Sequence, residues 1–219
     1  MDRQKAIDLF AELTPKEIAA AWSAGRALRP PEMRRGLYLG RAGGFPPAFR
    51  PVVRHVVGRD FFAKLILDGW GVNVRVAQDG THAPRPSPLV PGGFKVDLPF
   101  RLGADALDYG FHAAGRDFGF PGGLSQMRDF LRAVDFRSLT EVLGEATLAK
   151  VGARRGSAAE VGELVIGYIA PLGVQLLQTS PFGMCWWRDA TDVETESARA
   201  YLRTSRLLDA SCGDAAPAD

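Results

Sequence analysis

The sequence predicts an α+β protein built mainly on an antiparallel β-sheet. Three observations lead to this fold class: an Asp-Gly pair between two apolar runs, capping boxes near both ends of the chain, and the order of the elements. Two helices come first, followed by several strands, one helix, more strands and a closing helix. Strands and helices in this order favour an antiparallel sheet, whereas a parallel sheet needs strands and helices that alternate.

The clearest local signal is FFAKLILDGWGVNVRV at residues 61–76. Asp68-Gly69 predicts a hairpin with a type I′ turn, which needs positive φ at both central residues. In the resulting register Lys64 lies opposite Asn73, on a face of mixed polarity. Side chains alternate between the two faces of a strand, so the other face is wholly apolar. It carries Phe61, Ala63, Leu65, Leu67, Trp70, Val72, Val74 and Val76.

Helices are predicted at four places. Apolar residues at three- and four-residue spacing indicate an N-terminal helix before residue 14. Thr14 and Glu17 form a capping box that opens a second helix, with Gly25 as a left-handed cap. A middle helix is predicted over residues 124–134. A second capping box, Thr191 with Glu194, opens a helix that ends near residue 208.

The predicted strands follow apolar alternation and glycine or proline boundaries. Pro99 lacks an amide donor, so its strand is predicted to lie at a sheet edge or to end there. The strands, with the hairpin included, are residues 36–40, 61–67, 70–76, 94–100, 107–113, 142–150, 162–170, 173–179 and 183–189.

Length and composition predict one domain over residues 1–210 and a disordered tail over 211–219. A chain of 219 residues accommodates a β barrel or sandwich. The net charge of +2 and the scattered basic residues argue against a nucleic-acid partner. No apolar run approaches the ~20 residues needed to cross a bilayer, so no membrane partner is expected. The N-terminal residues lack a signal-peptide core, and the two cysteines, Cys185 and Cys212, make a disulfide framework improbable. We therefore expect a cytoplasmic protein.

The stretch GLYLG at residues 36–40 resembles the signature of bacterial GxWxG-domain proteins of unknown function, with Tyr38 in place of the tryptophan. FFAK at residues 61–64 is similar to the WYGK segment of that family, and MRDFLRAVD at 127–135 resembles the start of a small domain that often follows it. The match covers residues 5–150, with both diagnostic aromatics replaced. It implies a lipocalin-like antiparallel barrel or half-barrel, but no characterised activity. The motif positions that carry over are Gly36, Tyr38, Gly40 and Lys64.

Strong catalytic or cofactor signatures are missing from the sequence. His55, His82 and His112 are far apart and not at metal-ligand spacing from a cysteine, so no metal is expected. The glycine-rich stretches match neither a dinucleotide fingerprint nor a P-loop, so no cofactor is expected either. Cys185 is flanked by methionine and tryptophan, which favours a buried apolar thiol over a nucleophile.

The aromatic residues that do not belong to the apolar face are candidates for the wall of a cavity. Trp186 and Trp187 are adjacent on one strand, so one indole must point to each face, and we place Trp186 in the cavity. Cavities with aromatic walls and few polar groups are typical small-molecule sites. Alternatively, helices cover this second face as another packed layer. The predicted ligand-binding residues are Tyr38, Phe62, Asn73, Tyr168 and Trp186.

Lys64 interrupts an otherwise apolar run and is either a solvated lysine or a donor inside the cavity. In a cavity it could be joined by Asp97, Asp108 or Glu145. We expect its face to look into the cavity. Replacing Lys64 with methionine should then weaken ligand binding and leave thermal stability nearly unchanged. The predicted catalytic residues are Lys64, Tyr109 and His112.

Three functions are compatible with this pattern. The first is binding of a small apolar or aromatic molecule in a barrel- or cup-shaped cavity. The second is a cofactor-independent cyclase, isomerase or dehydratase of specialised metabolism on the same scaffold, which would use acid/base chemistry. The third is a protein that binds a partner, with a homodimer left open, through a sheet edge near Pro99 and the paired tryptophans.

Overall fold

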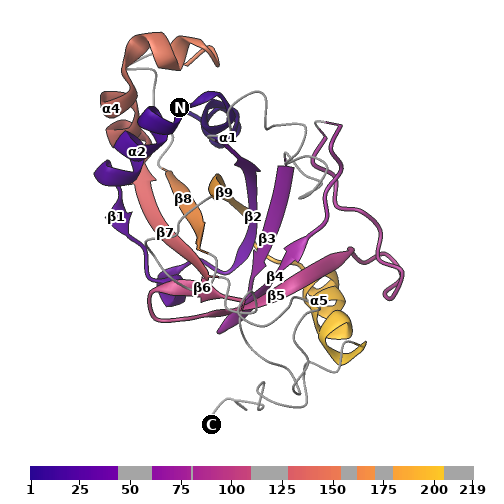
Figure 1. Ribbon diagram of the computed structural model, residues 1–219. Helices are drawn as coiled ribbons and strands as arrows, with labels where there is room; N and C mark the ends of the chain where they lie inside the picture. Colours follow the sequence, from indigo (N-terminus) through magenta and orange to yellow (C-terminus); the bar gives the residue numbers. More distant parts are fainter. Residues whose placement is uncertain (44–60, 80, 110–127, 154–161, 171–179, 205–219) are drawn as a thin grey trace.

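A closed antiparallel β-barrel forms the centre of the protein (Figure 1). The computed structural model describes residues 1–43, 61–79, 81–109, 128–153, 162–170 and 180–204. Strands follow one another around the barrel in the order β7-β6-β5-β4-β3-β2-β9-β8, and the pairing of β8 with β7 closes the ring. This closure confirms the predicted fold class, and it leaves the ring with no free edge.

Every described strand pairing is antiparallel, as the order of the elements predicts. The short strand β1 (Arg26–Ala27) pairs with β7 on the same side as β6, beyond the point where β6 ends. The barrel strands are β2 (Gly36–Ala42), β3 (Phe61–Ile66), β4 (Trp70–Val74), β5 (Val96–Leu102), β6 (Ala106–Asp108), β7 (Arg128–Asp135), β8 (Glu163–Ala170) and β9 (Ser180–Arg188).

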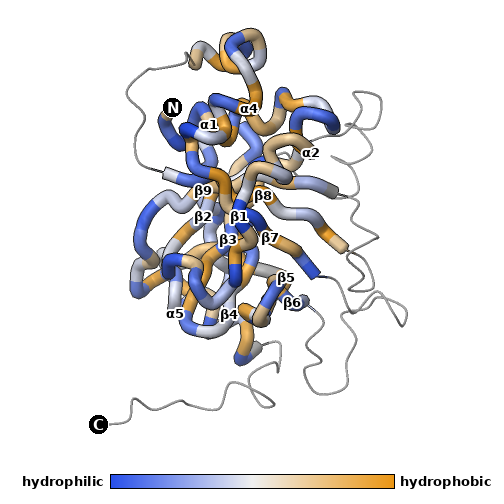
Figure 2. The backbone as a smooth tube through the Cα atoms, turned by 90° about the vertical axis from the view of Figure 1, so that its left-hand side faces the viewer, coloured by the Kyte–Doolittle hydropathy of each residue, from blue (hydrophilic) through white to orange (hydrophobic). Residues whose placement is uncertain are grey.

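In the described residues, four α-helices pack against the barrel. Figures 1 and 2 both show α1, α2 and α4 gathered together, with α5 on a different side of the barrel. A short 3₁₀ turn, η1, follows β1. The bounds are α1 (Arg3–Glu12), α2 (Pro15–Ala24), η1 (Pro30–Glu32), α4 (Phe136–Ala149) and α5 (Asp192–Thr204).

Local capping explains where these helices begin. Thr14 accepts a hydrogen bond from the Glu17 amide, and the Glu17 side chain accepts one from the Thr14 amide, which confirms the predicted capping box. Thr191 and Glu194 exchange the same two hydrogen bonds at the start of α5. The α4 helix breaks at Gly144, whose φ of 73° lies in the left-handed region.

Two large hydrophobic clusters lie on opposite sides of the barrel wall, one outside the barrel and one inside it. The outer cluster joins Leu65 and Val72 on the hairpin to Phe10 of α1, Leu139 of α4 and Ala198 of α5. The apolar hairpin face therefore packs under helices, as expected. The inner cluster fills the barrel with residues from different strands, among them Tyr38, Ile66, Phe100, Tyr109, Leu131 and Phe182.

The hairpin has the predicted register but a different turn. Lys64 lies opposite Asn73, and Leu65 lies opposite Val72. Gly69 has φ of 78°, whereas Asp68 is not among the described non-glycine residues with positive φ. A type I′ turn needs positive φ at both positions, so the predicted turn type is wrong. Positive φ at the second position alone is the pattern of a type II turn.

Two element predictions are wrong in the middle of the chain. Residues 128–134 lie in β7, not in a helix, and residues 142–149 lie in α4, not in a strand. In β7 the residues Asp129, Leu131 and Ala133 point inward while the residues between them point outward. The long pairing of β7 with β8 overrides the helix-like spacing of its apolar residues.

Pro99 and Gly25 also differ from expectation. Pro99 lies opposite Val72 in β5, which is an internal barrel strand and not an edge. A register shift beside this pair and φ of 42° at Leu98 accommodate it, as in a bulge. Gly25 ends α2 with φ of −76°, so it is not a left-handed cap. A β-carbon there would lie 3.1 Å from Arg132 Cβ, so close packing on β7 accounts for the glycine.

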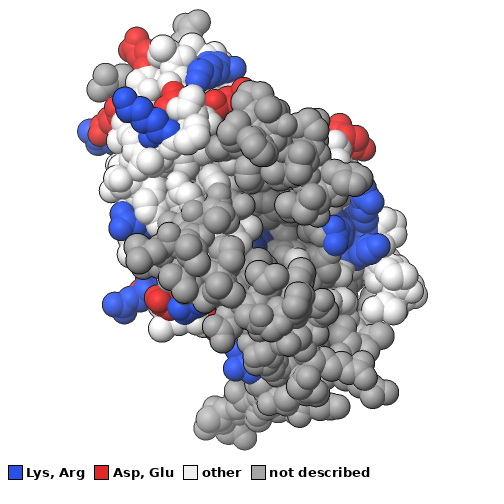
Figure 3. Space-filling view, in the orientation of Figure 1, with Lys and Arg blue, Asp and Glu red and all other residues white. Residues whose placement is uncertain are grey.

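Some predictions fall outside the described residues, namely the strand at 173–179, residues 110–113 of the strand at 107–113, and the tail at 211–219. No helix in the described ranges is long and apolar enough to cross a membrane. On the face shown in Figure 3, Lys and Arg side chains are interspersed with Asp and Glu at the top, and a group of Lys and Arg lies at the right.

Candidate functional site

Four of the residues predicted for the cavity form one row across the inside of the barrel. Asn73 of β4 lies opposite Lys64 of β3, Lys64 lies opposite Tyr38 of β2, and Tyr38 lies opposite Trp186 of β9. All four side chains face the inside of the barrel. The row therefore connects a buried polar cluster at Lys64 to an open pocket at Trp186.

The buried cluster is an ion pair with two neutral partners. Lys64 Nζ lies 3.1 Å from Oδ2 of Asp129, and both side chains are almost fully buried. Lys64 also donates a hydrogen bond of 3.1 Å to Asn73 Oδ1 and contacts the Tyr109 hydroxyl. The Tyr109 hydroxyl in turn donates to Asp129 Oδ2 at 2.9 Å. A buried charge is tolerated when it is paired and hydrogen-bonded in this way.

One polar atom in this cluster has no hydrogen-bond partner among the described residues. Asp129 Oδ1 is buried and accepts no hydrogen bond from that part of the chain, although its other oxygen accepts from Tyr109 and pairs with Lys64. Leaving a buried acceptor unsatisfied costs about 1–3 kcal/mol, so such an atom in a native protein calls for an explanation, such as a catalytic role or a bound water.

Aromatic rings surround the Lys64 ammonium. Nζ lies 5.0 to 5.6 Å from the ring centroids of Phe62, Phe100, Tyr109 and Phe182, within cation–π range. Each of the three phenylalanines lies opposite an inward-facing glycine on the neighbouring strand. These cross-strand pairs are Gly40 with Phe62, Gly71 with Phe100, and Gly167 with Phe182.

The glycines make this arrangement sterically possible. A β-carbon built on Gly71 would lie 2.5 Å from the Phe100 ring, closer than real atoms approach, so any larger residue would displace the ring. Glycine here lets each ring lie over the neighbouring strand and fill the barrel centre. The interior around Lys64 is therefore tightly packed.

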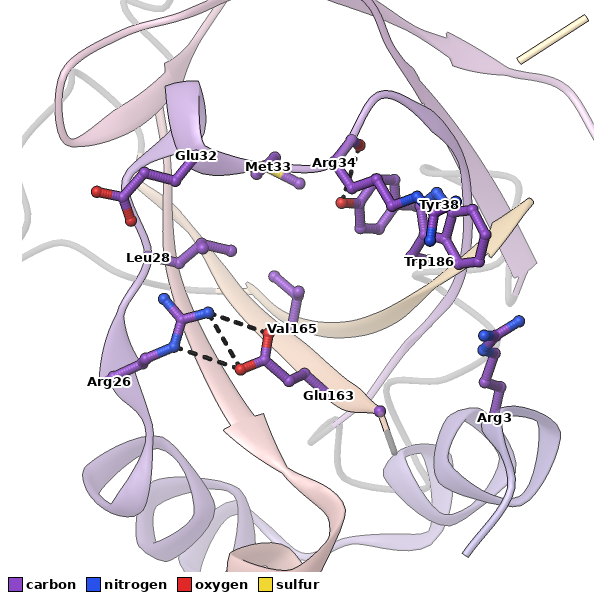
Figure 4. A pocket seen from close by; sticks show the side chains of 11 residues that line it. Arg3, Arg26, Leu28, Glu32, Met33, Arg34, Tyr38, Glu163, Val165 and Trp186 are labelled. Carbon is purple, nitrogen blue, oxygen red and sulfur yellow. Dashed lines mark hydrogen bonds and ion pairs between the residues drawn. The ribbon is translucent and has the colours of Figure 1, made fainter. Parts of the chain in front are cut away.

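A pocket of about 290 Å³ lies at the end of the barrel where β2 and β8 begin and β9 ends (Figure 4). This volume is at the lower end of the range for small-molecule sites. Its aromatic lining residues are Tyr38 and Trp186, and its rim carries charged side chains. The apolar lining consists of Leu28, Met33 and Val165.

The charged residues of the pocket are three arginines and two glutamates, namely Arg3, Arg26, Arg34, Glu32 and Glu163. Arg26 forms a bidentate ion pair with Glu163, with its shortest distance 3.0 Å. The guanidinium carbon of Arg34 lies 3.5 Å from the centroid of the Trp186 ring, and that of Arg3 lies 4.9 Å from it. Two arginines therefore lie within cation–π distance of one indole at the pocket, and Figure 4 shows Arg34 beside the ring.

Tyr38 forms the boundary between the pocket and the buried cluster. Its hydroxyl donates a 3.1 Å hydrogen bond to the Arg34 carbonyl, which Figure 4 marks with a dashed line. Burial raises the pKa of Tyr38 to about 12. At neutral pH this side chain is therefore a neutral hydrogen-bond donor, not a phenolate.

The other predicted site residues are dispersed. Tyr168 lies on the outer face of β8, where its ring packs edge-on against Trp22 at 4.9 Å between centroids, so the structure does not bring it to the pocket. Phe62 and Tyr109 belong to the buried cluster and do not line the pocket. His112 lies outside the described residues.

The partner of Lys64 was not predicted from the sequence. Asp129 was expected to lie on a helix, whereas the three carboxylates proposed for Lys64 were Asp97, Asp108 and Glu145. The structure instead places Asp129 at Lys64, and Glu145 is exposed on α4. No local signal singled out Asp129, because RDFLRAVD at residues 128–135 does not alternate strictly between polar and apolar residues.

Metal and thiol chemistry receive no structural support in the described ranges. No group of three or more His, Cys, Asp or Glu residues there could hold a metal ion. Cys185 points away from the barrel interior and is buried, which raises the pKa of its thiol to about 12. It is protonated at neutral pH and is not a nucleophile, in agreement with the prediction.

Comparisons with protein-family models, curated proteins and solved structures find no match for this chain. The resemblance to GxWxG-domain proteins stays a prediction.

Proposed function

We propose that this protein binds a small apolar or aromatic molecule in the pocket at the end of its barrel. The observation that carries this proposal is the lining of the pocket, in which inward-facing Tyr38 and Trp186 stand beside three apolar side chains. Such a wall stabilises an apolar body, while Tyr38 and the arginines supply a few fixed polar contacts. The volume of about 290 Å³ suits a ligand of one or two fused rings.

A pocket-filling substitution tests this proposal. Val165 is an inward-facing residue of the pocket, and replacing it with phenylalanine adds a ring where the ligand would lie. The probe is 2-naphthamide, an uncharged two-ring molecule, titrated by isothermal calorimetry. We expect the parent to bind it and Val165→Phe to weaken binding at least tenfold.

The matched control is Val142→Phe, which makes the same change on an exposed position of α4. It should bind 2-naphthamide like the parent. Equal affinity in the parent and in Val165→Phe, with the pocket variant still folded by circular dichroism, would remove this pocket as the binding site.

The buried cluster favours a second candidate, a cofactor-independent cyclase, isomerase or dehydratase. Lys64, Tyr109 and Asp129 join a cation, a phenol and a carboxylate whose Oδ1 has no hydrogen-bond partner among the described residues, and this set could transfer protons. Lys64 of this cluster lies directly opposite Tyr38 on the neighbouring strand. Access for a substrate would require movement of Tyr38 or of the phenylalanines around Lys64.

Proton abstraction from 5-nitrobenzisoxazole tests this second candidate. A base removes the C3 proton, the N–O bond breaks, and the released phenolate is followed by its absorbance. An enzyme of this class should accelerate the reaction above the buffer rate and lose the acceleration in Asp129→Asn. A parent rate equal to buffer would favour a binding protein.

We further propose that the protein works in the cytoplasm. It has two cysteines, and the described one, Cys185, is a buried free thiol. Homodimer formation stays a prediction.

A further inference from the structure

Arg3 is a cation at the pocket with no carboxylate partner in the part of the chain that the structure describes. Its Nη1 donates a hydrogen bond of 3.2 Å to the Trp187 carbonyl, and its guanidinium lies over the Trp186 ring. The other two arginines of the pocket are paired, Arg26 with Glu163 and Arg34 with Asp189. Arg3 therefore has no ion pair among the described residues, although the Glu32 carboxylate also lines the pocket.

The pairing of Arg34 is also weak. Asp189 lies outside the pocket lining, its side chain is 75% exposed, and its nearer oxygen is 3.1 Å from the guanidinium. Exposed ion pairs of this kind contribute little because water screens them. The Arg34 guanidinium therefore remains available to bind an anion in the pocket, next to Trp186.

The indole fixes both guanidinium groups in place. Arg34 stacks on Trp186 at 3.5 Å, and the Trp186 Nε1 donates to the Arg35 carbonyl at 3.3 Å, which holds the ring. Arg3 is the first residue of α1 and directly follows the N-cap Asp2, whose side chain accepts a hydrogen bond from the Lys5 amide. A planar guanidinium held against an aromatic ring is pre-organised for a carboxylate.

We infer that the ligand is an organic acid, with its carboxylate beside Arg3 and Arg34 and its apolar body against Val165, Met33 and Leu28. This inference rests on the proposed function, because it names the class of ligand for the same pocket. It adds that charge, and not only the apolar surface, selects the ligand.

A pair of probes that differ in charge alone tests the inference. 2-Naphthoate and 2-naphthamide have the same rings and nearly the same size, but only the first is anionic at pH 7. We expect the parent to bind 2-naphthoate at least tenfold more tightly, as hydrogen bonds to a charged group predict. The Arg3→Gln variant should lose most of this difference.

Two further variants provide controls. Arg3→Lys keeps the charge and should retain part of the preference for 2-naphthoate. Arg29→Gln removes an exposed arginine of the same N-terminal region that does not line the pocket, and it should change neither affinity.

The outcomes separate the two levels of the argument. Equal affinity of the parent for both probes overturns the inference and leaves the proposed function intact. The same holds if Arg29→Gln reduces the preference for 2-naphthoate as much as Arg3→Gln does. Binding of neither probe by the folded parent overturns the proposed function and, with it, the inference.

Discussion

The Lys64 ammonium lies 3.1 Å from the Asp129 carboxylate at the centre of the barrel, and both side chains are at most 5% exposed. Lys64 comes from β3 and Asp129 from β7, which are not neighbours in the ring of strands. The ion pair therefore spans the barrel interior and links two strands that share no backbone hydrogen bonds. Its partners on β4 and after β6, Asn73 and Tyr109, extend the link to further parts of the wall.

Replacing Lys64 with methionine should strongly destabilise the protein. The change would leave the Asp129 carboxylate buried without its cation, which costs about 3–5 kcal/mol. This reverses the expectation from the sequence that stability would stay nearly unchanged. Urea unfolding followed by circular dichroism measures the effect, and a loss below about 1 kcal/mol would show that the carboxylate is not held by Lys64.

The double variant Lys64→Met/Asp129→Leu separates a lost pair from a lost side chain. Apolar replacement of both members of a buried pair is often neutral or stabilising, so the double variant should recover most of the stability. The coupling energy of this double-mutant cycle should exceed about 1 kcal/mol. Additive losses would contradict a direct interaction.

Replacing Gly69 with valine should destabilise the hairpin through its backbone alone. The φ of 78° is unfavourable for a β-branched residue, and no neighbouring atom lies within 4 Å of the added Cβ. We expect a loss of about 1–3 kcal/mol. Gly69→Asn should lose less, because asparagine tolerates the left-handed region. Equal losses for the two variants would point to some cause other than φ.

Glu17 should make stability depend on acid pH. Hydrogen bonds from the Thr14 amide and then from Thr147 lower the pKa of Glu17 from its ordinary value of 4.5 to about 2. Because the folded pKa is lowered, its stabilisation is present above pH 4.5 and is lost as the pH falls toward 2.

The comparison with Glu17→Gln measures this contribution. The variant should be less stable than the parent by about 1 kcal/mol at pH 7, and the difference should shrink as the pH falls through this window. Glu12→Gln, at the exposed end of α1, is the matched control and should show no such trend. A constant difference between parent and Glu17→Gln from pH 7 to pH 2 would refute the assignment.

Local patterns were sufficient to predict much of the fold. The register of Lys64 opposite Asn73 follows from two alternating strands and a short turn, so no distant residue is needed to define it. The capping box at Thr14 is equally local. By contrast, β7 has apolar residues at both helical and strand spacing, and only its pairing with β8 decides between them.

The candidate site shows the same division. Alternation along the hairpin placed Lys64 and Asn73 on one face, and Tyr38 and Trp186 were predicted as cavity aromatics that do not belong to the apolar face. Sequence cannot show that these four strands lie side by side in the order that makes one row. Nor can it show Asp129 as the counter-ion, because that contact depends on closure of the barrel. The pocket arginines come from three separated segments and carry no local motif.

A crystal structure of the protein with 2-naphthoate bound tests the central claim most directly. We predict that the rings lie at the end of the barrel against Tyr38, Trp186 and Val165, with the carboxylate toward Arg3, while the Lys64–Asp129 pair stays intact behind Tyr38. A ligand bound outside the barrel, with this pocket empty and the protein saturated in solution, would contradict the account.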